Sequence, residues 1–232
     1  MKISAIIPAA GLGVRMGRSV PKQFLQLNHQ SVLRHTVNAF EKYGLFSAVI
    51  LVAPADSIDA TCDEFADIKV ISRIVSGGKK RQDSVFAGLK ALDEDVDIVV
   101  VHDGVRPFLN RRMIRESVDI AAEHGAAITA IPVSDTIKRV NSQGFVDRTI
   151  NREGLWRVQT PQAFRYSLLR QALEKAASDS YYGTDEGSLI EYIGKAVKII
   201  HGSELNIKIT QPEDLILAEK IAANENYFED GS

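Results

Sequence analysis

The chain has 232 residues, of which 45% are hydrophobic and 25% are charged. This length and balance are typical of a folded globular protein, so we expect residues 1–232 to form one domain rather than two small ones. Lys and Arg number 28 against 30 Asp and Glu, and a formal net charge of -2 argues against a nucleic-acid binder.

The single cysteine, Cys62, has no partner for a disulfide or a Cys-based zinc site. We expect it to be a small buried hydrophobe in a reducing compartment. The apolar run 3–7 is interrupted by Pro8 and Gly11, and the other apolar runs are far shorter than the roughly 20 residues that span a bilayer. These features predict a cytoplasmic protein that does not associate with a membrane.

Short β-branched runs alternate with segments of helical periodicity, a pattern typical of an α/β fold with a mostly parallel sheet and helices on both faces. We expect strands at Lys2–Ile7, Ala48–Ala53, Lys69–Val75, Asp97–Val101, Ala126–Ile131, Ala196–His201 and Asn206–Thr210. We expect helices at Ser31–Tyr43, around 85–92, at Asn110–His124, near Ser167–Ser178, at Asp185–Ile193 and from about Gln211. Thr210 and Glu213 have capping-box spacing at the start of the last helix.

The stretch from about 134 to 154 departs from this rhythm. Thr136–Val140 and Phe145–Ile150 alternate polar and apolar residues around the turn Asn141–Gly144, which predicts a β-hairpin. Both segments are too polar for a central strand, so we expect a projecting arm whose apolar side chains are buried by a second subunit.

The most informative motif follows the first expected strand and runs from Pro8 to Gly17. Small residues at this position let backbone N–H groups approach a ligand's phosphates. The loop lacks the Gly-Lys-Ser/Thr of a Walker A motif, and Met16 occupies the third small position of a dinucleotide fingerprint. For the glycines alone, a plain glycine-rich turn is an equally good interpretation, but Arg15 and Lys22 add two cations that could neutralise charge growing on a phosphorus centre.

Two further clusters follow later strands. Gly77, Gly78 and Ser84 surround the basic run 79–81, which by itself indicates no more than a solvated charged surface. Asp103 and Arg106 lie just after the expected strand 97–101, where α/β sheets place their ligands, although a structural ion pair between them is an alternative. His102 lacks further ligands at metal spacing, so we interpret it as a structural residue.

Nine motifs, in order along nearly the whole chain, resemble those of the bacterial 2-C-methyl-D-erythritol 4-phosphate cytidylyltransferases. They are Pro8-Ala9-Ala10-Gly11-x-Gly13-x-Arg15-Met16, Pro21-Lys22-Gln23, Gly77-Gly78-x-x-Arg81-x-x-Ser84-Val85, His102-Asp103-x-x-Arg106-Pro107, Asp135-Thr136-x-Lys138, Arg152-x-Gly154-Leu155-Trp156, Thr160-Pro161-Gln162, Thr184-Asp185-Glu186 and Asn206-Ile207-Lys208.

The resemblance implies a Rossmann-like nucleotidyltransferase fold and transfer of CMP from CTP to methylerythritol phosphate, with pyrophosphate released and Mg²⁺ or another divalent cation as cofactor. It assigns catalysis to four cations: Arg15, Lys22, Arg152 and Lys208. It assigns nucleotide binding to Pro8, Ala9, Ala10, Gly11, Gly13, Gly78, Ser84 and Asp103. It assigns the sugar-alcohol phosphate to Asp103, Arg106, Thr136, Arg152, Thr184 and Lys208. No protein metal site is implied, because CTP phosphates are expected to hold the cation. The family resemblance also implies a homodimer in which Thr136 and Arg152 reach the partner's active site.

Three other functions compete with this one. A ribitol 5-phosphate cytidylyltransferase shares most of the cations, but the sequence Pro8-Ala9-Ala10-Gly11 favours the methylerythritol branch. A regulatory nucleotide-binding module without activity would be expected to lose Arg15 or Lys22, and both are present. A dinucleotide-dependent oxidoreductase is disfavoured by Met16.

Overall fold

The computed structural model describes residues 1–11 and 21–223. Its centre is a seven-stranded sheet with the strand order β11-β7-β10-β6-β1-β4-β5. The strands are β1 (Ile3–Pro8), β4 (Ala48–Ala53), β5 (Ile71–Ser76), β6 (Ile98–Val101), β7 (Ala126–Pro132), β10 (Trp156–Arg165) and β11 (Lys198–His201). Strand β10 is antiparallel to both its neighbours, whereas the other pairs are parallel, so the mostly parallel sheet of the prediction is confirmed.

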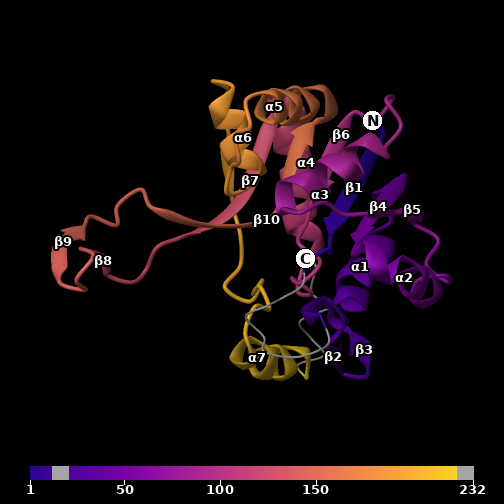
Figure 1. The fold of residues 1–232 in the computed structure, drawn as a ribbon, viewed down its shortest axis with the longest axis horizontal. Coiled ribbons are helices and arrows are strands. Elements are labelled where there is room, and N and C mark those ends of the chain that lie inside the picture. The colour runs from indigo at the N-terminus through magenta and orange to yellow at the C-terminus, as the bar shows by residue number, and fades with distance from the viewer. Residues whose placement is uncertain (12–20, 224–232) are drawn as a thin grey trace.

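Helices cover both faces of the sheet (Figure 1). They are α1 (Val32–Tyr43), α2 (Ile58–Glu64), α3 (Arg81–Lys90), α4 (Arg111–His124), α5 (Tyr166–Ser178), α6 (Glu186–Tyr192) and α7 (Pro212–Ala222), with short 3-10 turns at Lys22–Phe24 and Ala55–Ser57. Helices α1 and α4 begin at the side-chain caps Ser31 and Asn110, which accept hydrogen bonds from the first turn. The prediction of helices on both faces is therefore confirmed.

Alternation along the central strands divides the core in two. Ala5 and Ile7 of β1 pack with α1 and α4, whereas Ile6 packs with α3, α5 and α6 on the opposite face. Strand β6 alternates in the same way, because Ile98 and Val100 face the side of α1 and α4 together with Ala5 and Ile7. Because every second residue is buried on each face, these strands read as continuous apolar runs, which is typical of a sheet covered on both sides.

A hairpin leaves the body between β7 and β10. Its strands β8 (Ile137–Val140) and β9 (Val146–Ile150) pair only with each other, and the arm extends far from the sheet (Figure 1). Gly144 closes the turn with a left-handed φ of 84°, and the side chain of Asn141 accepts two backbone N–H groups there. The predicted arm is present.

Several local expectations were wrong. The segment 206–210 is not a strand, because its backbone bonds to loops instead: Ile209 N–H donates to the Val105 carbonyl and Arg106 donates to the Asn206 carbonyl. The last helix is capped by Gln211 with Asp214, one position later than the expected Thr210 and Glu213 pair. Cys62, expected to be buried, is exposed on α2, a helix that was not predicted.

The long strand β10 was also missed, and the small strands β2 (Gln26–Leu27) and β3 (Gln30–Ser31) with it. Pro161 lies inside β10, and a residue without an N–H is rarely found within a central strand. The structure accommodates it by shifting the pairing register between Val158 and Gln162 against β7. A proline inside a strand pattern therefore concealed the strand that carries several residues of the site.

Candidate active site

A cavity of about 880 Å³ opens at the carboxyl ends of the parallel strands β1, β4, β5 and β6. Its volume is that of a typical ligand site. Strand β1 has β4 on one side and β6 on the other, so the strand order reverses there, and open α/β sheets bind ligands next to such a point. Its lining comprises Pro8, Ala9, Ala10, Gly11, Lys22, Gln23, Pro54, Ala55, Asp56, Gly77, Gly78, Lys79, Lys80, Arg81, Ser84, Asp103, Val105 and Lys208.

The first wall is the loop after β1. Ala9 N–H donates to the Val52 carbonyl at 2.7 Å, and the buried side chain of Gln23 donates to the Ala9 carbonyl at 2.6 Å, so the loop is fixed from both sides. Lys22, predicted to be catalytic, lines the cavity. Gly13 and Arg15, the other predicted members of this loop, lie outside the described residues.

The second wall is the loop between β5 and α3. The Ser84 hydroxyl accepts from the Gly78 N–H at 3.2 Å and donates to the Lys80 carbonyl at 3.2 Å. A Cβ at Gly77 would lie 2.2 Å from the Cβ of Ala10, so only glycine lets the two walls approach this closely. The structure thus brings the predicted nucleotide-binding residues Pro8, Ala9, Ala10, Gly11, Gly78 and Ser84 around one cavity.

A smaller cavity of about 220 Å³ adjoins the first. Arg81, Asp103 and Lys208 line both cavities. The other residues of the smaller cavity are Arg106, Val158, Gln159, Thr160, Gln162, Thr184 and Asp185. Two ligands placed in these cavities would therefore meet at a wall of three charged side chains.

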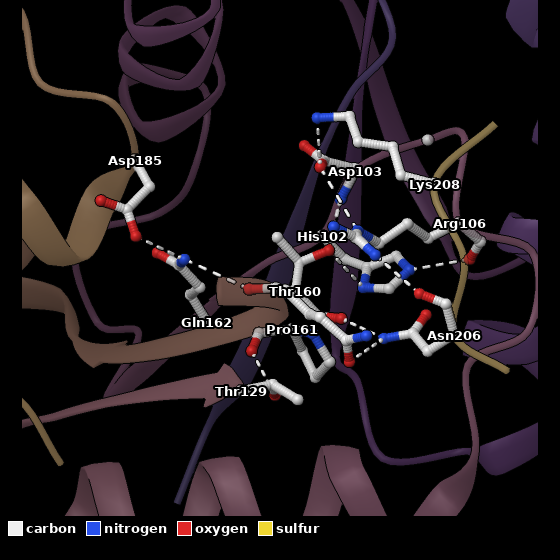
Figure 2. A network of polar contacts seen from close by, with 12 residues as sticks. His102, Asp103, Arg106, Thr129, Thr160, Pro161, Gln162, Asp185, Asn206 and Lys208 are labelled. Carbon is white, nitrogen blue, oxygen red and sulfur yellow. Dashed lines mark hydrogen bonds and ion pairs between the residues drawn. The ribbon is translucent and has the colours of Figure 1, made fainter. Parts of the chain in front are cut away.

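Asp103 is the centre of that wall. Its carboxylate contacts Lys208 Nζ at 2.8 Å, and Arg106 Nε lies 3.6 Å away (Figure 2). Arg81 Nε contacts the same carboxylate at 2.9 Å. Burial alone would raise the pKa of Asp103, but the positive charges of these three side chains outweigh it and hold the pKa well below its usual range. Asp103 is therefore ionised and orients three cations. The ion pair between Asp103 and Arg106, which the sequence left open as a structural alternative, is present alongside the contacts that face the cavities.

His102 fixes the turn that carries Asp103. Its Nε2 lies 3.0 Å from the Arg106 carbonyl, which can only accept, so Nε2 carries the proton. Its Nδ1 then accepts from the Thr160 hydroxyl at 3.0 Å, and that hydroxyl accepts from the Asp103 N–H at 3.1 Å (Figure 2). Burial lowers the pKa of His102 to about 4, so the ring is neutral and the direction of each hydrogen bond is set.

The network continues to the segment that carries Lys208. Arg106 Nη1 donates to the Asn206 carbonyl at 2.6 Å, and the Asn206 amide donates to the Thr160 carbonyl at 2.8 Å (Figure 2). Asn206 is completely buried. Segments far apart in sequence, after β6, within β10 and before α7, are therefore joined behind the charged wall.

The predicted substrate residues divide into two groups. Asp103, Arg106, Thr184 and Lys208 lie together at the smaller cavity. Thr136 and Arg152 do not: both are exposed at the base of the arm, and Arg152 donates to the Ser134 carbonyl of the same arm. Neither lines one of the two cavities of its own chain.

The ion pair that supports the charged wall joins two residues that were not selected from the sequence, Arg81 and Glu186. Arg81 lines both cavities, yet it stands in the basic run 79–81 that reads as a solvated surface. Glu186 is buried and pairs with Arg81, from 105 residues away in the chain. Both belong to recognised motifs, so the signal was present, but the pairing itself depends on the tertiary fold.

In the part of the chain that the structure describes, no group of three or more His, Cys, Asp or Glu side chains could hold a metal ion. Among the described residues, the carboxylates that line the larger cavity are Asp56 and Asp103. In those same ranges, no helix has the length and apolar character needed to cross a membrane.

Comparison with known proteins places the chain in a family. The family model of 2-C-methyl-D-erythritol 4-phosphate cytidylyltransferase matches residues 3–224. The proteins of that name from Syntrophus aciditrophicus and Pelotomaculum thermopropionicum are 44% and 46% identical, and the alignments cover 97% and 95% of this chain and 97% and 94% of those proteins. A crystal structure of 4-diphosphocytidyl-2C-methyl-D-erythritol synthase from Anaerococcus prevotii superimposes with a TM-score of 0.85 at 34% identity, covering 96% of this chain and 99% of that one. A match over nearly the full length of both partners, together with the two cavities and their shared charged wall, shows that this chain belongs to the 2-C-methyl-D-erythritol 4-phosphate cytidylyltransferase family.

Proposed function

We propose that this chain transfers the cytidylyl group of CTP to 2-C-methyl-D-erythritol 4-phosphate and releases pyrophosphate, a step of isoprenoid biosynthesis. Family membership supports the reaction. The observation that carries its assignment to this site is the wall shared by the two cavities, since Arg81, Asp103 and Lys208 border both. CTP would occupy the larger cavity and the acceptor phosphate the smaller one.

The reaction needs an acceptor oxygen in line with the bond that breaks. A phosphate oxygen of the acceptor forms the new P–O bond at the α-phosphorus, and the bond to the β-phosphate oxygen breaks as pyrophosphate leaves. A phosphate is already ionised at neutral pH, so positioning and charge neutralisation matter more than proton removal. We propose that Lys208 and Arg106 bind the attacking phosphate. Lys22 and Arg15 would neutralise the charge that develops on the triphosphate.

We propose that the nucleotide's base lies between the two loops of the larger cavity. Ala10, Gly77 and Gly78 offer close backbone approach, and Ser84 holds the second loop in shape. Pro8, Ala9, Gly11 and Gly13 would border the ribose and phosphates. The glycine N–H groups would be the donors, because Pro8 has none and the Ala9 N–H bonds to Val52. The hydroxyls of the acceptor would meet Asp103 and Thr184.

Mg²⁺ or another divalent cation is proposed as the cofactor. Magnesium is commonly held by one or two carboxylates together with substrate phosphates, and the larger cavity offers Asp103 and Asp56 but no ready-made cage among the described residues. Asp103 is already shared by three cations, so the phosphates of CTP would supply most of the ligands. When bound, the cation neutralises charge on the phosphates.

We further propose a cytoplasmic homodimer with shared active sites. The arm exposes apolar side chains, with Phe145 and Val146 at 69% and 60% exposure, which a second copy would cover. Thr136 and Arg152 lie on the arm, away from both cavities of their own chain, so a role in substrate binding requires the partner's cavity. A low cysteine content is the support for the cytoplasmic location.

A pyrophosphate-release assay tests the proposed function. The purified chain is supplied with Mg²⁺, with each of the four NTPs in turn, and with either methylerythritol phosphate or ribitol 5-phosphate. We expect release with CTP and methylerythritol phosphate alone. Equal or faster release with ribitol phosphate, or none with methylerythritol phosphate, would refute the assignment.

A further inference from the structure

The charged wall between the two cavities is held from behind by a residue that faces neither of them. Glu186 is the first residue of α6 and is only 1% exposed. Both of its carboxylate oxygens accept from Arg81 Nη1, at 2.7 Å and 2.9 Å. The residues that line the two cavities include Arg81 but not Glu186, so the carboxylate contacts the wall without touching either space.

Arg81 is thereby held between two acids. Its Nε donates to Asp103 at 2.9 Å while its Nη1 donates to Glu186, so two of the three guanidinium nitrogens are held by carboxylates. Burial disfavours the charge of Arg81, but Glu186 and Asp103 outweigh it and raise its pKa, so the side chain is always protonated. Although the Arg81 side chain is 30% exposed, its guanidinium cannot turn without losing one of these two partners.

Glu186 also balances the charge of the wall. Arg81, Arg106 and Lys208 all approach Asp103, which is a single carboxylate. With Glu186 neutralised, Arg81 would depend on Asp103 alone and would compete there with Lys208, whose contact is 2.8 Å. The position of Lys208 at the smaller cavity is therefore linked to a carboxylate it does not touch.

The neighbouring residue Gln82 strengthens the connection. Its amide donates to the Tyr181 carbonyl and accepts from the Gly183 N–H, each at 3.0 Å. Two consecutive side chains at the start of α3 thus attach to the segment 181–186, which carries Thr184 at the edge of the smaller cavity. The beginning of α3 is the end of the loop that forms the second wall of the larger cavity, so both cavities are fixed to one structural unit.

We propose that Glu186 is a positioning residue of the transferase reaction: it holds Arg81 between the nucleotide and the acceptor phosphate, and through Asp103 it keeps Lys208 in place. This inference rests on the proposed function. Its effect falls on the geometry of attack more than on the affinity for CTP, because Glu186 meets the second loop at Arg81, which borders both cavities, and not at the residues that we assign to the base. A misplacement of about 1 Å at reacting groups can cost about 100-fold in rate.

The test compares Glu186→Gln with Glu191→Gln, the same change at an exposed position of the same helix. Steady-state pyrophosphate release gives kcat and KM, and calorimetry with Mg²⁺ and CTP, without acceptor, gives the Kd. For Glu186→Gln we expect kcat to fall about 10- to 100-fold while the Kd for CTP changes less than about threefold. Glu191→Gln should match the wild type.

A double-variant cycle separates positioning from a general loss of structure. If Glu186 acts through Arg81, then adding Glu186→Gln to Arg81→Gln should lower kcat by less than about twofold further. Should Glu186→Gln not fold, Glu186→Asp carries the test, since it keeps the charge but withdraws the carboxylate by one methylene. We expect it to lower kcat with its melting temperature close to that of the wild type.

Three outcomes would count against the proposals, and they are distinguishable. An inactive wild-type chain would refute the proposed function. An active wild type with an equally active Glu186→Gln variant would overturn only the role of Glu186. An undiminished effect of Glu186→Gln in the Arg81→Gln background would also overturn it, because the residue would then act by another route.

Discussion

His102 gives the structure a pH-dependent stability that can be worked out in advance. Burial lowers its pKa from 6.5 to about 4, so the unfolded chain takes up a proton at a higher pH than the folded chain does. Stability therefore rises with pH between these two values and is lost as pH falls from 6.5 toward 4. Within that interval the free energy of unfolding changes by about 1.4 kcal/mol per pH unit. Titration of this one ring therefore lowers stability by about 3 kcal/mol over the whole interval and by about 2 kcal/mol between pH 7 and pH 5.

The perturbation is His102→Gln, which keeps a donor within reach of the Arg106 carbonyl but does not titrate. Urea unfolding at pH 7 and pH 5 gives the free energy of unfolding of both proteins by linear extrapolation, at one protein concentration because association shifts apparent stability. The variant is expected to be less stable at pH 7, where packing against Phe40 is lost. Its further loss on going to pH 5 should be about 2 kcal/mol smaller than that of the wild type.

Equal losses of stability in the two proteins between pH 7 and pH 5 would refute this reasoning. A second observation is independent of stability. Nitrogen NMR of the wild type at pH 7 should show His102 as the neutral tautomer with its proton on Nε2. A proton on Nδ1 would contradict the hydrogen-bond directions through Thr160 to Asp103.

Three further predictions concern the site. In steady-state assays, Lys208→Met should raise KM for the acceptor phosphate about tenfold or more and raise KM for CTP, whose cavity it also lines, by less; equal changes in both would contradict its assignment to the attacking phosphate. Gly77→Ala puts a Cβ 2.2 Å from Ala10, so calorimetry should show weakened CTP binding, and thermal melting a loss of about 1–3 kcal/mol; unchanged affinity would argue against the base lying between these loops. Arg152→Ala and Lys22→Ala chains, each nearly inactive alone but folded, should recover activity when mixed, and persistent inactivity in demonstrated heterodimers would refute shared sites.

The sequence predicted well those features that repeat along the chain. The strand at Ala48–Ala53 was predicted to the residue, and the helix ending at Gly44 was indicated by a glycine that takes up a left-handed φ of 59°. Apolar runs and caps are local signals, which depend on few residues. The hairpin was also local, because its turn chemistry and alternation lie within about 20 residues.

What the sequence did not reveal depends on contacts between distant segments. Strand β10 runs antiparallel between β6 and β7, a placement set by pairing partners rather than by its own pattern, which Pro161 interrupts. The pairing of Arg81 with Glu186 likewise joins two motifs that were each recognised alone. Motif spacing selected most of the residues at the two cavities, but which acid holds which cation required the fold.

A crystal structure of the chain with CTP and Mg²⁺ tests the central claim most directly. The account predicts cytosine between the loop 8–11 and the loop 77–84, with the triphosphate directed toward Lys22 and the α-phosphate facing the wall of Arg81, Asp103 and Lys208. A nucleotide bound away from this cavity, or bound in it with the α-phosphate turned from that wall, would contradict the account.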